Sequence, residues 1–95
     1  MDQDQIKTIG DICKQFGISY LGMFGSYARG DNKPDSDVDL LVEYGERKSL
    51  FDHVRIQRQF SEMLHKNVDL VTKRSLHPYI KDYVYKDLRA LYEER

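Results

Sequence analysis

Residues 18–44 read ISYLGMFGSYARGDNKPDSDVDLLVEY and contain two apolar segments separated by a polar one. Residues 18–24 and 37–44 are rich in amino acids that favour extended structure, so each segment predicts a buried strand. Residues 25–36 between them are polar and concentrate the turn-forming residues Gly, Asp, Asn and Pro. This stretch therefore predicts two strands that flank a long turn.

Patterns on both sides extend this arrangement. Apolar residues recur at helical spacing in three segments, which are residues 4–16, residues 50–65 and the segment that begins at Pro78. Gly17 is a stop signal for the first helix, and Ser49 can cap the second. Residues 67–72, NVDLVT, predict a third strand. Residues 89–93 fit either the last turn of the final helix or a short edge strand.

The predicted order is helix, strand, strand, helix, strand, helix, which indicates an α/β or α+β fold. We expect a small mixed sheet of three to four strands packed against helices. The chain has 95 residues, so residues 1–95 are expected to form a single domain.

Composition restricts the class of protein. The net charge of −1 gives no support to a polybasic nucleic-acid binder. Cys13 is the only cysteine, which excludes an intrachain disulfide and a zinc finger and suits a reducing compartment. No apolar run approaches the length of a membrane span, and the polar N-terminus is no signal peptide. We therefore expect a cytoplasmic protein.

Three aspartates lie in apolar segments where strand propensity disfavours them. Asp37 and Asp39 are two residues apart, so their side chains point to the same face of a strand. Asp69 repeats the pattern in the third predicted strand and joins the other two if the strands are neighbours. Adjacent carboxylates repel each other, and a divalent cation removes that conflict. Hard oxygen ligands suit Mg²⁺ or Mn²⁺, so the pattern predicts one or two such ions.

Two plainer interpretations compete with this one. Each aspartate could be a solvent-facing strand residue or a cap, although three in matching contexts make that a weak explanation. The acidic residues from Asp35 to Glu46 also approach the spacing of an EF-hand loop. Leu40 stands where that loop requires glycine, which excludes the EF-hand.

A Gly-Ser turn precedes the aspartates. Gly25 allows a ligand to approach the backbone, and a helix that begins at Ser26 would direct free N–H groups towards a phosphate. Arg29 is a candidate phosphate clamp. Gly25 and Gly30 have the spacing of the two P-loop glycines, but Asp31 and the residue after it replace the Lys-Ser/Thr pair, which argues against a P-loop. Taken alone, the Gly-Ser turn fits a plain strand-to-helix turn equally.

Together, GSYARG at residues 25–30 and SDVDL at residues 36–40 strongly resemble the signature of the DNA polymerase β-like nucleotidyltransferase superfamily. The short form of both motifs is similar to the minimal nucleotidyltransferase (MNT) branch, and Asp69 matches the third acidic position of that family. The resemblance covers nearly the whole chain.

The resemblance implies roles for individual residues. Gly25 and Ser26 would hold the triphosphate of ATP, and Arg29 and Ser36 would lie near the nucleotide. The catalytic and metal-binding residues would be three aspartates that together bind two Mg²⁺ ions, with Mn²⁺ as a possible substitute: Asp37, Asp39 and Asp69.

The resemblance also implies a biological role. Minimal nucleotidyltransferases resemble the antitoxins that are encoded beside HEPN-domain toxins and transfer AMP from ATP to a tyrosine of the toxin. This suggests an ATP-dependent protein adenylyltransferase that binds a HEPN partner, with no membrane or direct nucleic-acid contact expected. Two alternatives stay open, which are an antitoxin that acts by contact alone and a nucleotidyltransferase that modifies a small molecule such as an aminoglycoside. Tyr79 and Tyr83 lie one helical turn apart and would either form an interface or cover the sheet.

Overall fold

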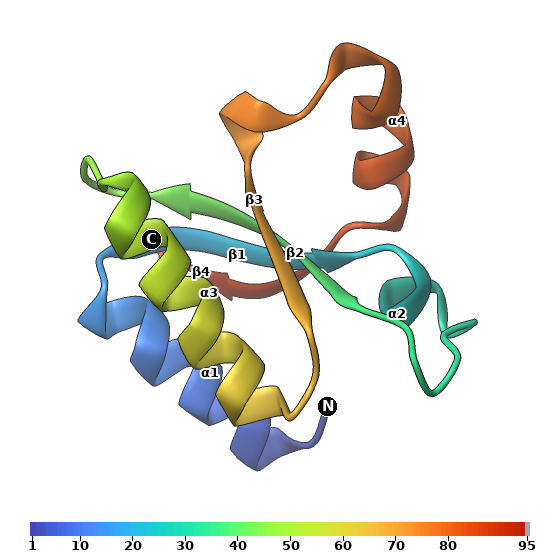
Figure 1. Cartoon of the computed structure of the whole chain (residues 1–95), viewed down its shortest axis with the longest axis horizontal. Helices are drawn as coiled ribbons and strands as arrows, with labels where there is room; N and C mark the ends of the chain where they lie inside the picture. The colour runs from blue at the N-terminus through green and yellow to red at the C-terminus, as the bar shows by residue number, and fades with distance from the viewer. Residues whose placement is uncertain (95) are drawn as a thin grey trace.

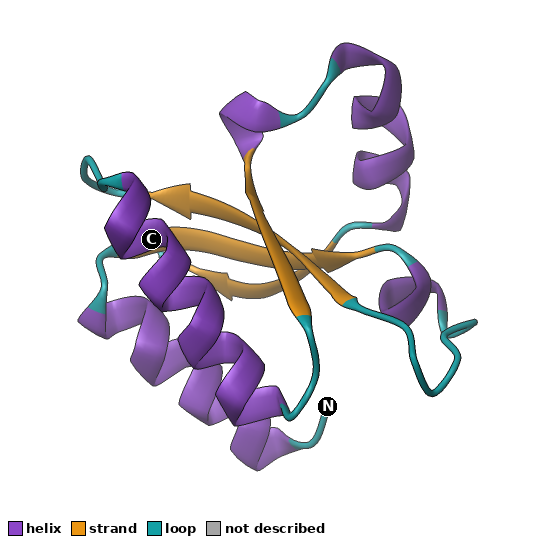
Figure 2. Ribbon diagram, viewed as in Figure 1, coloured by secondary structure: helices purple, strands orange, loops and turns teal. Residues whose placement is uncertain are grey.

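The computed structural model describes residues 1–94 and contains a four-stranded mixed sheet (Figure 1 and Figure 2). The strand order is β3-β2-β1-β4. β1 (Ile18–Phe24) pairs antiparallel with β2 (Val38–Tyr44) and with β4 (Arg89–Glu93), whereas β3 (Val68–Thr72) is parallel to β2. The predicted fold class, a small mixed sheet packed against helices, is confirmed.

Helices cover both faces of this sheet, but unequally. Figure 1 shows α1 and α3 together on one side of the sheet and α4 on its own near the opposite corner. The helical segments are α1 (Gln3–Gln15), α2 (Ser26–Arg29), α3 (Leu50–Leu64), the 3₁₀ turn η1 (Lys73–Ser75) and α4 (Pro78–Asp87). Ser49 caps α3 as predicted, because its side chain accepts a hydrogen bond from the backbone N–H of Asp52.

The main core lies between the sheet and the pair α1 and α3. On β2 it takes every second residue, Val38, Leu40 and Val42, and on α3 it takes the buried residues Ile56, Phe60 and Leu64. Cys13 of α1 belongs to this core, where burial raises the pKa of its thiol to about 12. The free thiol is therefore structural.

A second, smaller apolar cluster lies on the other face of the sheet. It joins Leu41 of β2 to Leu76 and to Val84 of α4, with Leu88 packed against it. Because side chains alternate along a strand, Asp39 points to the same face as Leu41 and away from α1 and α3. This alternation places the predicted site on the face that only α4 and η1 partly cover.

The structure decides one open point about the helices and corrects another. Of the two alternatives for residues 89–93, the edge strand is the correct one, because α4 stops at Asp87 and residues 89–93 form β4. Hydrogen bonding to β1 is available there and competes with the last helical turn. Phe51 and Val54 do not join the apolar face of α3 but are exposed.

In residues 1–94, no helix is long and apolar enough to cross a bilayer.

His53 of α3 is partly buried. Its ring nitrogens lie 2.8 Å from the hydroxyl of Tyr44 and 2.7 Å from the carbonyl oxygen of Leu70. Since a carbonyl can only accept, Nε2 donates to Leu70 and Nδ1 accepts from Tyr44. His53 thus fixes α3 to β2 and β3.

Candidate active site

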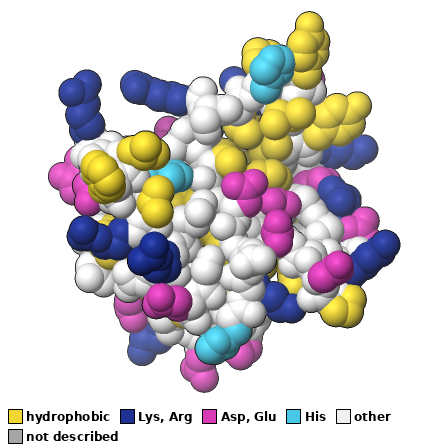
Figure 3. Space-filling view, viewed as in Figure 1, with side chains coloured by type: hydrophobic (Ala, Val, Ile, Leu, Met, Phe, Trp, Pro, Cys, Tyr) yellow, Lys and Arg dark blue, Asp and Glu magenta, His cyan; other side chains and the backbone are white. Residues whose placement is uncertain are grey.

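Two of the predicted acidic residues are direct neighbours in the sheet. Asp39 of β2 and Asp69 of β3 are partners in the parallel register. The two strands are neighbours, which was the condition for Asp69 to join the other aspartates, and both carboxylates lie on the face opposite α1 and α3. Asp39 is half-buried, whereas Asp69 is exposed. Figure 3 shows acidic side chains gathered near the centre of this view.

Asp37 lies just before β2, in the loop that follows α2. Burial raises the pKa of the Asp39 carboxyl, the carboxylates of Asp69 and Asp37 raise it further, and the Arg29 guanidinium lowers it. All three aspartates therefore share one electrostatic environment. Asp37 also lines a hollow of about 540 Å³ between this loop and the end of α3.

Gly25 brings the backbone against Asp39. Phe24, the last residue of β1, is the antiparallel partner of Asp39, so the chain turns into α2 directly beside that carboxylate. Gly25 has φ 77° and ψ −156°, a conformation that is essentially reserved for glycine. A Cβ at this position would overlap Oδ2 of Asp39 and lie 3.2 Å from its Cγ. Gly25 is therefore required both for the turn and for the space that Asp39 occupies.

The remaining predicted residues surround this centre. Ser26 begins α2 and is half-buried, and its carbonyl accepts the backbone N–H groups of Gly30 and Asp31. Ser36 is half-buried in the loop between α2 and β2, where its hydroxyl accepts a hydrogen bond from the backbone N–H of Lys33 at 2.8 Å. Ser36 thus shapes the loop that carries Asp37.

Arg29 links two helices. Its guanidinium donates to Asp31 at 3.1 Å and to Asp87, the last residue of α4, at 2.7 Å. These hydrogen bonds raise the pKa of Arg29, which is already a permanent cation. The guanidinium has five N–H donors and these bonds use two of them, so a phosphate can bind Arg29 without replacing either carboxylate. Sequence reasoning missed Asp87, because it lies 58 residues from Arg29 and carries no local signal.

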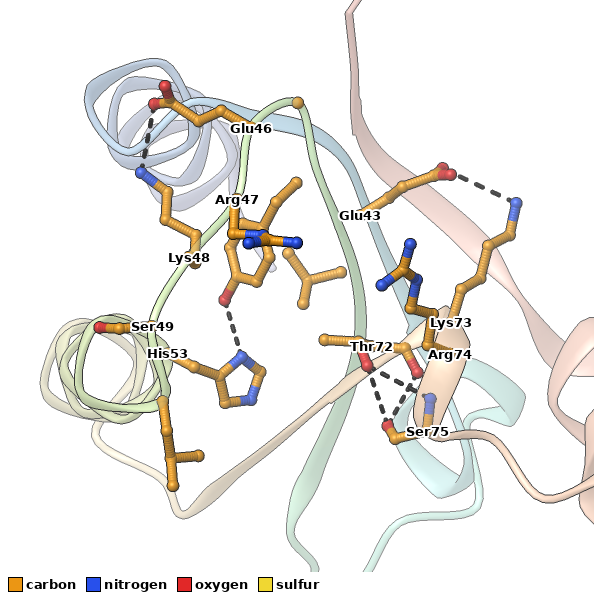
Figure 4. A pocket seen from close by; sticks show the side chains of 14 residues that line it. Glu43, Glu46, Arg47, Lys48, Ser49, His53, Thr72, Lys73, Arg74 and Ser75 are labelled. Atoms are coloured by element: carbon orange, nitrogen blue, oxygen red, sulfur yellow. Dashed lines mark hydrogen bonds and ion pairs between the residues drawn. The ribbon is translucent and has the colours of Figure 1, made fainter.

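A hollow of about 800 Å³ lies at the other end of β2 and β3 and contains none of the predicted site residues. Figure 4 shows four cationic side chains around it, two of them in ion pairs with Glu46 and Glu43: Arg47, Lys48, Lys73 and Arg74. Despite its size, this hollow lacks acidic groups that are free to bind a cation. The acidic centre around Asp39 is the better candidate for chemistry.

The donor chemistry of that centre fits a divalent cation. In residues 1–94, none of the carboxylates of Asp37, Asp39 and Asp69 accepts a hydrogen bond or pairs with a lysine or arginine. No direct hydrogen bond or ion pair therefore offsets their mutual repulsion, which the charge of Arg29 reduces only in part, and hard oxygen donors suit Mg²⁺ or Mn²⁺. Over the same residues, no three acidic, histidine or cysteine side chains already converge on one point. Rotation of these side chains would have to complete the ligand set around an ion.

Comparison with known proteins identifies the family. The model of the nucleotidyltransferase domain matches residues 6–91. The chain belongs to the nucleotidyltransferase family. It is 43% identical to a candidate protein adenylyltransferase of Methanocaldococcus jannaschii, over 92% of this chain and 95% of that protein. It is 38% identical to the protein adenylyltransferase MntA of Thermococcus cleftensis, over 82% of this chain and 79% of that protein.

Solved structures agree with this assignment. A candidate minimal nucleotidyltransferase shares 32% identity and a TM-score of 0.79, over 92% of this chain and 89% of that one. The fold also matches a toxin-antitoxin structure with AMP-PNP, with a TM-score of 0.79, 21% identity and coverage of 95% and 74%. A tri-AMPylated HEPN toxin of Shewanella oneidensis in complex with an MNT antitoxin gives a TM-score of 0.74, 20% identity and coverage of 98% and 73%. The expected minimal branch of the family is confirmed.

Proposed function

We propose that this chain is an antitoxin that transfers AMP from ATP to a tyrosine hydroxyl of a HEPN-domain toxin. The main support is that Asp39 and Asp69 are partners in the parallel register of β2 and β3, and that the backbone of Gly25 packs against Asp39. The names of the relatives support protein adenylyl transfer. The AMPylated toxin found with a protein of the same fold supports the kind of acceptor.

In this proposal Asp37, Asp39 and Asp69 hold two Mg²⁺ ions, and the turn at Gly25 and Ser26 holds the triphosphate. When bound, the ions would neutralise phosphate charge and make the acceptor oxygen a stronger nucleophile. Gly25 leaves room for the phosphates because it has no side chain. Ser26 contributes its hydroxyl and backbone N–H at the start of α2. Arg29 and Ser36 flank the nucleotide.

The bond changes are those of an in-line displacement. The tyrosine oxygen forms a bond to the α-phosphorus, and the bond from that phosphorus to the bridging oxygen breaks, which releases pyrophosphate. The proton of the hydroxyl passes to a carboxylate, and we assign this role to Asp69 because it is exposed where an acceptor from outside can reach it. The half-buried Asp39 then acts only in binding and orientation.

The test is intact-mass measurement of the HEPN-domain protein encoded by the adjacent gene, after incubation with this chain, ATP and Mg²⁺. A gain of one or more AMP units is expected. Asp39→Asn and Asp69→Asn should each slow the transfer by about a hundredfold or more. Asp35→Asn is the matched control, since Asp35 is an exposed acid of the loop that carries Asp37, and it should transfer at the wild-type rate.

Two other outcomes would refute the proposal. A stable complex whose partner keeps its unmodified mass would indicate an antitoxin that acts by contact alone. The absence of a complex, together with AMP on an aminoglycoside, would indicate a small-molecule enzyme.

A further inference from the structure

Helix α4 presents an aromatic surface to solvent. Tyr79 is 84% exposed, Tyr83 is 73% exposed and Ile80 is 49% exposed. His77, the N-cap of the helix, stacks on the ring of Tyr79 with the centroids 4.9 Å apart. We refer to these four residues as the α4 patch. Exposure of two tyrosines and an isoleucine within one turn costs free energy that a bound partner would recover.

The α4 patch borders the candidate active site. Val84 anchors α4 to the small apolar cluster that contains Leu41, which lies two residues from Asp39 on the same face of the sheet. At the other end of the helix, Asp87 pairs with Arg29, which lies near enough to Asp39 to lower its pKa. Figure 3 shows a hydrophobic area on the α4 side of the molecule next to the central acidic group. A protein that covers α4 would therefore also reach the carboxylates.

The side chains of the α4 patch suit an apolar surface on the partner rather than a charged one. The charges of α4 balance, because Lys81 and Lys86 are matched by Asp82 and Asp87. The helix therefore offers no net field to attract a polyanion. Tyrosine supplies a large contact area at a low entropy cost and retains a polar tip, which explains its enrichment at protein interfaces.

We propose that the α4 patch is the docking surface for the acceptor protein, and that it holds the acceptor with its tyrosine hydroxyl over Asp39 and Asp69. The inference rests on the proposed function, which requires a protein acceptor at this face. The partner surface is an apolar one that surrounds the modified tyrosine. Docking on α4 acts by positioning, since none of the patch residues belongs to the acidic centre or to the turn at Gly25 and Ser26.

The experiment compares two variants with the wild-type chain. Tyr79→Ser/Tyr83→Ser removes the aromatic rings of the patch. Phe51→Ser is the matched control, because Phe51 is also 84% exposed in the first turn of a helix but lies in α3, next to Leu50, which lines the hollow at the other end of the sheet. Both variants are checked for an unchanged thermal midpoint and for unchanged affinity for ATP with Mg²⁺.

The tyrosine double variant should weaken binding of the HEPN-domain partner at least tenfold and raise KM for that acceptor by a similar factor, with kcat within twofold of wild type. The Phe51→Ser variant should stay within twofold in both measurements. Equal losses in both variants, or a double variant that binds as wild type does, would overturn the assignment. So would a wild-type dimer in light scattering that the double variant dissociates, because the patch would then serve self-association.

Failure of the chemistry is distinguishable from failure of the docking surface. If wild type binds the partner through Tyr79 and Tyr83 but adds no AMP, the docking surface holds and the proposed transfer is wrong. If AMP is transferred at the wild-type rate and KM by the double variant, the transfer holds and the docking surface is wrong.

Discussion

Replacement of Gly25 by alanine tests whether the turn and Asp39 form one unit. The substitution forces a Cβ into a backbone conformation that costs about 1–3 kcal/mol for a residue other than glycine. The new methyl group also overlaps the Asp39 carboxylate, so Asp39 has to move or the turn has to open. Both effects add, and we expect a loss near the upper end, about 3 kcal/mol. For a chain of this size that loss lowers the thermal midpoint by about 12–24 °C.

Gly30 provides the control for this prediction. It also has a positive φ of 85°, but a Cβ there would meet nothing within 4 Å. Gly30→Ala should therefore lower the free energy of unfolding only by the cost of a left-handed backbone conformation, about 1–2 kcal/mol, and leave AMP transfer intact. Thermal unfolding and the transfer assay, run on both variants, separate backbone strain from displacement of Asp39.

The expected pattern is specific. Gly25→Ala should lose more stability than Gly30→Ala and should lose transfer activity at least tenfold. If Asp39 rotates out of the way, part of the stability returns but the activity does not. Equal stability and equal activity in the two alanine variants would refute the reasoning, because the proximity of Gly25 to Asp39 would then have no consequence.

Three further measurements follow from the structure. Burial and neighbouring carboxylates raise the pKa of Asp39, so its ionisation destabilises the fold as the pH rises through that pKa. Without metal, Asp39→Asn should therefore have a thermal midpoint at pH 7 at least as high as that of wild type. A clearly lower midpoint would count against repulsion between the carboxylates. Mg²⁺ at ten times its dissociation constant should stabilise wild type by about 1.4 kcal/mol, reversibly with a chelator, whereas Asp37→Ala/Asp39→Ala should not respond. His53→Ala removes both hydrogen bonds of the ring and should cost about 1–3 kcal/mol in urea unfolding, with AMP transfer retained at temperatures where the variant is folded.

Much of the fold was predictable because the signals are local. Apolar spacing and turn chemistry located the strand at residues 18–24 and the helix that Ser49 caps, and the structure reproduces both. Interactions between distant segments were not predictable in this way. The edge strand at residues 89–93 had a helical alternative, and only its pairing with β1 decides between them.

In the candidate site, too, the local features were predictable and the contacts between distant segments were not. Asp37 and Asp39 stand out because carboxylates in an apolar strand conflict with strand propensity. The partnership of Asp39 with Asp69 depended on which strands are neighbours, which the parallel register now supplies. The pairing of Arg29 with Asp87 has no local sequence signal, because it depends on where α4 docks. The spacing of Tyr79 and Tyr83 allowed either an interface or a cover for the sheet, and the position of α4 leaves both side chains exposed.

The way α4 is attached has a consequence for local unfolding. Val84 is its only buried residue, and the ion pair from Asp87 to Arg29 closes its far end. An element held by so few contacts opens at a lower free energy than the sheet beneath it. Backbone amides of residues 79–87 should therefore exchange with deuterium before those of α3, and faster still at high ionic strength, which screens the ion pair. Each such opening also releases the guanidinium of Arg29 next to the carboxylates.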